Sequence, residues 1–174
     1  MALKEILTEP NEILRQKSLN VEKVDEDLRK LMDDMMETMY AAPGIGLAAI
    51  QVGVPKRVVV LDISKKDEKK SPMYFVNPEI INKSTNLSTY EEGCLSVPGQ
   101  FAEIDRPHKC YIKYIDYYGE SKLMEAEGLL ATCIQHEIDH LEGILFIDHL
   151  SKLKKTMIIK KLSKQKKELE RIVV

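Results

Sequence analysis

Hydrophobic patterns along the chain predict a definite order of helices and strands. Between residues 25 and 41, apolar side chains recur at spacings of three and four, which predicts a helix with Asp25 as its N-cap. Short strand-like runs follow at residues 57–62, 74–77, 87–92, 110–117 and 121–125, and the last two are expected to form a hairpin. Further helices are predicted from Gly128 to about Glu142 and over residues 151–172. Strands in the middle of the chain with helices on both sides favour an α+β fold over a doubly wound parallel sheet.

Length and composition restrict the class of protein. With 174 residues, the chain is expected to form a single domain over residues 1–174. An apolar content of 44% with 31% charged residues excludes a disordered or fibrous chain. The N-terminus lacks the apolar core of a signal peptide, and no apolar run approaches the roughly 18 residues of a membrane span, so no membrane partner is expected. Three cysteines without a short paired spacing argue against a disulfide framework.

Charge is distributed unevenly along the chain. The whole chain has a formal net charge of −2, from 26 basic and 28 acidic residues. Residues 151–174, however, contain eight Lys and one Arg against two Glu, a net charge of +7, which leaves −9 on residues 1–150. We interpret this as an acidic body followed by a basic C-terminal helix. That helix is either a solvated helix face or an interface for RNA or another polyanion.

The segment His136-Glu137-Ile138-Asp139-His140 lies within the helix predicted to begin at Gly128. On a helix, side chains at positions i and i+4 share one face, so the two imidazoles can reach one divalent metal ion. Glu137 then projects beside them, where a general base would act on a water molecule. The alternative is that both histidines are ordinary helix residues, but the pair with its glutamate favours a metal site.

A catalytic metal takes three protein ligands and leaves one position open, so a third ligand is required. The positions that two groups of metallopeptidases use for this ligand hold Phe146, Lys160 and Lys161 here. Cys94 is the upstream candidate, because the preceding Gly93 lets the backbone turn close to an ion. A set of two histidines and one cysteine suits Zn²⁺ or Fe²⁺.

The other cysteines and histidines have simpler interpretations. Cys133 lies three residues before His136, so it is expected on the same helix face as the wall of a pocket. Cys110 alternates with its neighbours in a predicted strand and is interpreted as a buried strand residue. His108 and His149 lack a partner at ligand spacing and are interpreted as surface or structural residues.

A third segment, Gly44-Ile45-Gly46-Leu47-Ala48-Ala49-Ile50-Gln51, is rich in small residues that let a backbone approach a ligand closely. Together with Glu92–Ser96 and Gln135–His140, and in this order, it resembles the three motifs of the peptide deformylase family. The resemblance extends over most of residues 5–150. It implies an α+β fold in which antiparallel or mixed sheets pack around a central helix bearing the HExxH motif, with a basic helix at the C-terminus.

The resemblance implies hydrolysis of the N-terminal formyl group of formylmethionyl nascent peptides, with release of formate. It implies that one divalent metal ion, natively Fe²⁺ and in purified protein alternatively Zn²⁺, Ni²⁺ or Co²⁺, is bound by Cys94, His136 and His140. Glu137 would take a proton from the attacking water and pass it to the departing amine. The oxyanion would be held by the metal, the side-chain amide of Gln51 and the backbone N–H of Leu95.

The resemblance also implies how the substrate is held. The family's pocket for the methionine side chain corresponds to Ile45, Tyr90, Leu129 and Cys133. The backbone of Gly46 and Gly93 would pair with the extended peptide.

Four further positions are informative when compared with the family. Glu92 and Arg106 correspond to a structural ion pair. Thr132 stands where many members have an apolar pocket residue, and Phe101 stands where many bacterial members have Arg. The preference for side chains and the contacts beyond the methionine are therefore not fixed by the resemblance.

Two alternatives to a deformylase stay open at this point. One is a metallopeptidase of another HExxH family, which would cleave internal peptide bonds; the other is a catalytically silent, metal-stabilised ribosome-binding module. The intact Glu137 and Gln51 argue against the silent module. We expect a cytoplasmic monomer, or an organellar matrix protein if a transit peptide has been removed, that does not bind DNA. The basic helix, residues 151–174, is expected to dock the catalytic body, residues 1–150, on the ribosome, as in bacterial relatives with a similar extension.

Overall fold

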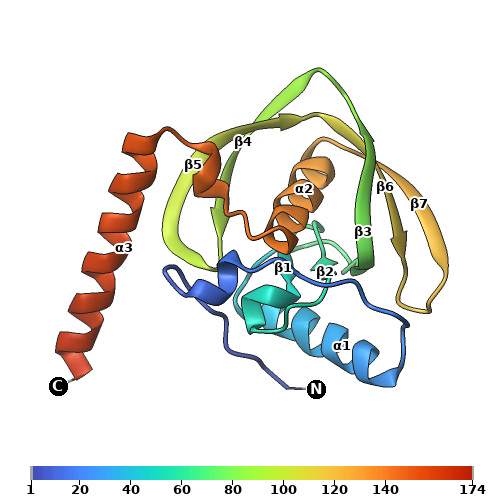
Figure 1. Cartoon of the computed structure of the whole chain (residues 1–174), viewed down its shortest axis with the longest axis horizontal. Coiled ribbons are helices and arrows are strands. Elements are labelled where there is room, and N and C mark those ends of the chain that lie inside the picture. Colours follow the sequence, from blue (N-terminus) through green and yellow to red (C-terminus); the bar gives the residue numbers. More distant parts are fainter. Residues whose placement is uncertain (1, 174) are drawn as a thin grey trace.

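The computed structural model describes residues 2–173, which form two β-sheets, three α-helices and three short 3-10 helices (Figure 1). The helices are α1 (Glu26–Ala41), α2 (Leu129–Leu141) and α3 (Lys152–Val173), and the 3-10 helices are η1 (Glu12–Arg15), η2 (Ala49–Val52) and η3 (Phe146–His149). The strands are β1 (Gly46–Ala48), β2 (Val58–Leu61), β3 (Met73–Lys83), β4 (Leu87–Cys94), β5 (Val97–Pro107), β6 (Lys109–Ile115) and β7 (Ser121–Glu127).

The two sheets differ in size and both are antiparallel. The larger sheet has five strands in the order β1-β2-β3-β6-β7, and the smaller one consists of β4 and β5. Helix α2 lies between the two sheets and contacts strands of both (Figure 1). The predicted α+β class with antiparallel sheets is therefore confirmed.

Strand β2 shows why the larger sheet is covered on both faces. Val58 and Val60 pack into a core with α1, whereas the alternate residues Val59 and Leu61 pack into a second core with α2. Successive strand side chains point to opposite faces, so a continuous apolar run is what a strand between two helical layers requires. All four side chains are completely buried.

The helices begin where the sequence predicts them. Asp25 caps α1, since its carboxylate accepts a hydrogen bond from the backbone N–H of Leu28 at 2.9 Å. Helix α2 begins directly after Gly128, whose φ of 62° favours glycine. Every residue of α2 from Ala131 to Ile138 is buried, as expected for a helix enclosed on all sides.

Three strands differ from the prediction. The short strand β1 lies in the segment rich in small residues and was not predicted. The strand predicted to end at Asn77 continues as β3 to Lys83. A bulge at Asn77, where φ is 49°, interrupts the ladder of hydrogen bonds, so the proline that follows is tolerated within the strand. Strand β5 was not predicted, and it contains Pro98 and Gly99, two residues typical of turns. Both strands of a two-stranded sheet have a free edge, and a proline is tolerated there.

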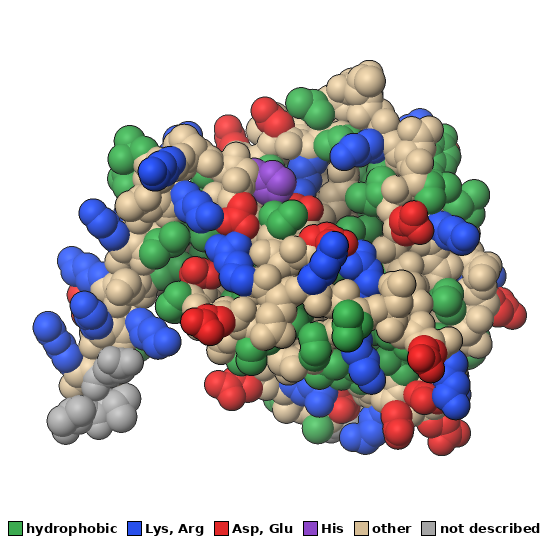
Figure 2. Space-filling view, viewed as in Figure 1, with side chains coloured by type: hydrophobic (Ala, Val, Ile, Leu, Met, Phe, Trp, Pro, Cys, Tyr) green, Lys and Arg blue, Asp and Glu red, His purple; other side chains and the backbone are tan. Residues whose placement is uncertain are grey.

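Helix α3 packs on the body through one face only. Ile158 and Leu162 are buried in a third core with residues of β5 and η3, and the lysines of α3 are mostly exposed. Figure 2 shows basic side chains gathered along this helix. Among the described residues, no helix combines the length and the apolar character that crossing a membrane requires.

Candidate active site

A cleft of about 530 Å³ lies where the smaller sheet faces the start of β1 and helix α2. The structure brings most of the predicted site residues together along its walls: Ile45, Gly46, Gln51, Tyr90, Gly93, Cys94, Leu95, Leu129, Cys133, His136 and Glu137. His140 lies behind them and is completely buried. Three segments that are far apart in the sequence therefore form one site.

The three predicted metal ligands converge at the floor of this cleft. One donor atom from each of Cys94, His136 and His140 lies within 4.8 Å of the others, and the Cys94 Sγ is 3.3 Å from the His140 Nε2. A thiolate and two imidazoles form a donor set for Zn²⁺ or Fe²⁺. Because the donors come from β4 and from successive turns of α2, the fold already holds them together, and the residues fit a single metal ion.

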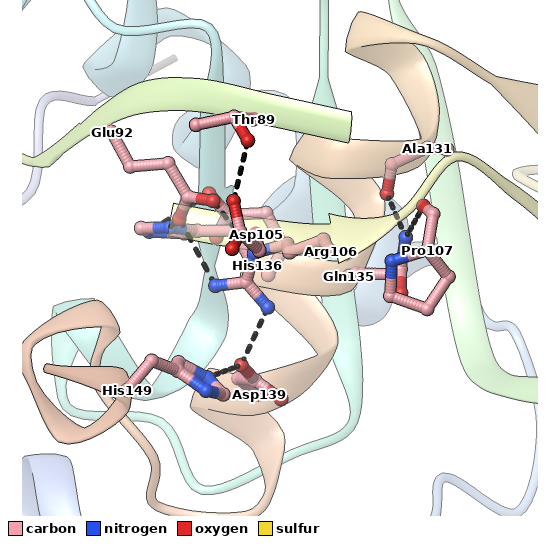
Figure 3. A network of polar contacts seen from close by, with 11 residues as sticks. Thr89, Glu92, Asp105, Arg106, Pro107, Ala131, Gln135, His136, Asp139 and His149 are labelled. Atoms are coloured by element: carbon pink, nitrogen blue, oxygen red, sulfur yellow. Dashed lines mark hydrogen bonds and ion pairs between the residues drawn. The ribbon is translucent and has the colours of Figure 1, made fainter. Parts of the chain in front are cut away.

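His136 is oriented by a carboxylate. Its Nδ1 lies 2.8 Å from the Glu92 Oε1, so the Nε2 is left to face the cluster (Figure 3). Glu92 in turn accepts hydrogen bonds from the Arg106 Nε at 2.6 Å and Nη2 at 3.0 Å. Burial alone would raise the pKa of Glu92, but the hydrogen bonds with His136 and Arg106 outweigh it and hold the pKa below its ordinary value. Glu92 is therefore ionised and pairs with Arg106, as the resemblance predicts.

Glu137 is placed beside the cluster and is buried. Its Oε1 lies 4.0 Å from the His136 Nε2, and no hydrogen-bond partner for its Oε2 occurs among the described residues. Burial raises the pKa of this carboxyl to about 7. A carboxyl group with such a pKa can both accept and release a proton near neutral pH.

Gln51 comes from η2 and is fixed at both ends of its amide. The Oε1 accepts a hydrogen bond from the backbone N–H of Ala48 at 2.9 Å. The Nε2 donates to the Ser96 Oγ at 3.0 Å and lies 3.6 Å from the Cys94 Sγ. The amide N–H groups thus point toward the cluster rather than away from it.

The outer part of the cleft is apolar. Ile45 and Leu129 are 44% and 40% exposed at its rim, which leaves them free to contact a ligand. Cys133 forms part of the wall, as predicted; burial raises the pKa of its thiol to about 12, so it stays neutral.

Sequence reasoning missed two groups of residues. Residues 97–100 line the cleft because β5 returns alongside β4 after a tight turn, and the prediction had no strand there. Phe101, which the comparison with the family had singled out, lines the cleft beside them. His149, interpreted as a surface or structural residue, lies 2.8 Å from the Asp139 carboxylate. No spacing rule in the sequence signals that contact, because it joins α2 to η3 across an intervening turn.

A half-buried cysteine and two buried histidines at the floor of a cleft, with a buried glutamate and an amide beside them, fit a metal-dependent hydrolase. The comparisons with known proteins narrow this class. A family model described as polypeptide deformylase matches residues 3–156. A peptide deformylase from Pelagibacter ubique (strain HTCC1062) is 67% identical over 174 residues, which is 100% of both chains.

Solved structures agree with this match. The peptide deformylase from Ehrlichia chaffeensis is 43% identical with a TM-score of 0.91, over 96% of this chain and 98% of that chain. A structure of peptide deformylase from the same organism in complex with actinonin is 45% identical with a TM-score of 0.90, over 95% and 98%. The chain belongs to the peptide deformylase family, whose members depend on a metal.

Proposed function

We propose that Cys94, His136 and His140 hold one divalent metal ion, at which this chain removes the formyl group from N-terminal formylmethionine. The reaction follows from membership of the deformylase family. The observation that supports the site is the convergence of the three donor atoms within 4.8 Å beside the buried Glu137, whose Oε2 has no hydrogen-bond partner among the described residues. When bound, the ion would supply Lewis-acid chemistry, making a water molecule more acidic and polarising a carbonyl group.

Glu137 is the proton carrier in this proposal. Its carboxylate accepts a proton from the attacking water and then donates it to the amine nitrogen as the formyl C–N bond breaks, which releases formate and a free methionine amine. The unpaired Oε2 and a pKa raised to about 7 by burial support this role, because the proton is held neither too tightly nor too weakly.

Gln51 and Leu95 stabilise the negative charge that develops on the formyl oxygen. The Gln51 Nε2 lies within 3.6 Å of the Cys94 Sγ, so one of its N–H groups can turn from the sulfur to the formyl oxygen. The backbone N–H of Leu95 is the second donor. Loss of one such donor typically lowers kcat by a factor of about 10²–10³.

The substrate lies along the cleft. The methionine side chain enters the apolar part formed by Ile45, Tyr90, Leu129 and Cys133, and the peptide backbone pairs with Gly46 and Gly93. The solved deformylase with 45% identity to this chain has been crystallised with actinonin. We expect actinonin to occupy the same cleft here.

Fe²⁺ is the proposed native metal, with Zn²⁺, Ni²⁺ or Co²⁺ able to replace it in the purified protein. The donor set supports this, since one thiolate and two imidazoles bind each of these ions. We further propose that the enzyme acts as a monomer and that it works in the cytoplasm, and its bacterial relatives support the second part of this proposal.

The proposed reaction is tested by formate release from a formylmethionyl peptide after anaerobic Fe²⁺ loading. Wild type is expected to release formate, and Glu137→Ala to release it about 10²–10⁴-fold more slowly. Glu142→Gln, which removes an exposed carboxylate at the end of the same helix, is the matched control and should behave like wild type. No formate from loaded wild type, or equal rates in wild type and Glu137→Ala, would contradict the proposal. Cleavage of an unformylated peptide would instead indicate a metallopeptidase.

The proposed organisation is a catalytic body, residues 1–150, extended by the basic helix, residues 151–174, which docks the enzyme on the ribosome. The support is electrostatic: the helix carries +7 and presents its lysines to solvent, while Ile158 and Leu162 anchor it to the body. Ribosomal RNA is the polyanion that such a helix would meet where nascent chains emerge.

Charge reversal tests docking without disturbing the anchoring side chains. Replacing Lys164, Lys166 and Lys167 by Glu should abolish co-sedimentation with ribosomes at low salt and leave formate release from a short peptide unchanged. The same triple reversal at Lys65, Lys66 and Lys69, in an exposed loop, is the matched control and should leave co-sedimentation intact. Equal co-sedimentation of the two triple variants would contradict docking through α3.

A further inference from the structure

A continuous series of polar contacts leads from His136 to the surface of the molecule (Figure 3). The inner part is described above: His136 contacts Glu92, and Glu92 is held by two nitrogens of Arg106. The third nitrogen of the same guanidinium, Nη1, donates to the Asp139 Oδ2 at 2.9 Å. Arg106 therefore joins a buried carboxylate to one that is partly exposed.

His149 forms the outer end of this series. Its Nε2 lies 2.8 Å from the Asp139 Oδ2, the same oxygen that accepts the hydrogen bond from Arg106. The His149 side chain is 40% exposed, whereas that of Arg106 is only 5% exposed. Because His149 belongs to η3 and Asp139 to α2, the contact also fixes η3 against the helix that carries both histidine ligands.

Because a guanidinium is rigid, the contact of Arg106 with Asp139 affects the contact of Arg106 with Glu92. The group is planar and its donors point in fixed directions, so a shift of the carboxylate on Nη1 tilts the pair of bonds that Nε and Nη2 make. Asp139 is on the outside of α2 and is held from one side by Arg106 and from the other by His149. Without His149, the Asp139 carboxylate can rotate, and the side chains of Arg106 and Glu92 can move with it.

We propose that His149 is a positioning residue for the metal site: by fixing Asp139, it sets the orientation of Arg106 and Glu92 and hence the direction of the His136 Nε2. This inference rests on the proposed function, in which His136 is a metal ligand. It gives a role to a residue that does not line the cleft and that, among the described residues, makes no hydrogen bond to any of the three ligands.

The expected effect is moderate. Loss of a direct hydrogen-bond partner of a metal ligand typically lowers metal affinity about 10–100-fold. Three residues, Asp139, Arg106 and Glu92, separate His149 from His136, and the salt bridge between Arg106 and Glu92 persists without His149. We therefore expect His149→Ala to weaken metal affinity about three- to tenfold, a smaller effect than that reference range.

The experiment compares Zn²⁺ affinity, measured by competition with a chromogenic chelator, in wild type, His149→Ala and His149→Gln. Glutamine keeps an N–H donor that can reach Asp139, so it should restore most of the affinity. His108→Ala is the matched control, because His108 contacts the hydroxyl of Ser88 outside this series. The visible spectrum of the Co²⁺-loaded proteins supplies a second readout, which should shift in His149→Ala and not in His108→Ala.

A double-variant comparison separates positioning from a general loss of stability. In an Asp139→Ala background, removing His149 should have no further effect on Zn²⁺ affinity, since the residue through which it acts is gone. Unchanged affinity in His149→Ala, or the same loss in both backgrounds, would overturn the proposal. Failure of wild type itself to bind Zn²⁺ with Cys94 as a ligand would instead overturn the proposed function, so the two failures are distinguishable.

Discussion

Gly46 leaves the space that the Glu137 carboxylate occupies. A Cβ at Gly46 would lie 2.6 Å from the Glu137 Oε1 and 3.0 Å from its Cγ, well inside contact distance. The first residue of β1 therefore determines whether the proposed proton carrier can sit beside His136. This relationship makes the absence of a side chain at Gly46 a requirement of the site rather than of the strand.

Gly46→Ala is accordingly expected to lose activity while keeping its fold. The carboxylate is the mobile end of a side chain, so it can move aside at small cost to stability. Its displacement should lower kcat/KM for a formylmethionyl peptide by about 10²-fold, within the range for loss of a general base. The measurement is formate release, with metal content and the melting temperature as controls. Wild-type activity in Gly46→Ala would show that the carboxylate tolerates displacement.

Thr132→Val is expected to stabilise the protein. The Thr132 hydroxyl is buried at the cleft wall, and no hydrogen-bond partner for it occurs among the described residues. Removing it with a side chain of the same shape should raise the free energy of unfolding by about 1 kcal/mol. Thr38→Val is the matched control: the Thr38 hydroxyl donates to the Asp34 carbonyl at 2.7 Å and accepts from the Lys4 N–H, so its loss should destabilise by a similar amount. Urea unfolding measures the change in unfolding free energy for each variant. Changes of the same sign in Thr132→Val and Thr38→Val would contradict the prediction.

Asp34 is expected to make stability depend on pH. Its buried carboxylate accepts a hydrogen bond from the Ala2 N–H at 2.8 Å, and this bond, with Lys30 and Lys4 nearby, holds its pKa below the ordinary value of 3.8 despite burial. A lowered folded-state pKa contributes stability above the unfolded-state pKa, and this contribution is lost as the pH falls through the folded-state pKa. The difference in unfolding free energy between wild type and Asp34→Ala should therefore be largest near neutral pH and shrink below about pH 4. A difference that grows on acidification would contradict this assignment.

Gly143→Ala is expected to be strongly destabilising. Gly143 follows α2 with a φ of 75°, and an added Cβ would collide with the carbonyl group of Arg15, whose carbon would be 2.8 Å away. Left-handed strain and a clash with backbone together should cost about 3 kcal/mol or more. Gly119→Ala separates the two causes, since its φ is 88° but the nearest atom, the Val24 Cβ, is at 3.7 Å; it should cost only about 1–2 kcal/mol. Similar unfolding free energies for the two variants would show that the clash relaxes.

Local patterns predicted the helices well and the strands less completely. Helix α1 carries its own signals, an apolar period and the Asp25 cap, so its start could be placed to the residue. Strand β5 could not be recognised, because Pro98 and Gly99 carry a turn signal and only pairing with β4 makes them extended. Tertiary pairing outweighs local preference there.

The residues of the site were predicted in two different ways. The spacing of His136 and His140 on a helix indicated a metal, and the need for a third ligand indicated Cys94 after Gly93. The role of Gln51 followed only from the resemblance to a family. The contact between Asp139 and His149 had neither kind of signal, since it depends on how the chain turns after α2. Contacts that join two elements through an irregular turn are the least accessible from sequence.

The distance along the chain between two of the proposed ligands has a consequence for folding. Cys94 and His140 are 46 residues apart in the sequence and 3.3 Å apart in space, so the proposed metal would close a loop of that length. On the chain-entropy relation used for covalent cross-links, closing such a loop restricts the unfolded chain by the equivalent of about 4 kcal/mol. A chain without disulfides would thus gain a cross-link that forms under reducing conditions and is removed by a chelator. The β4–β5 hairpin, rather than α2, would be the first part to come loose when the ion is withdrawn.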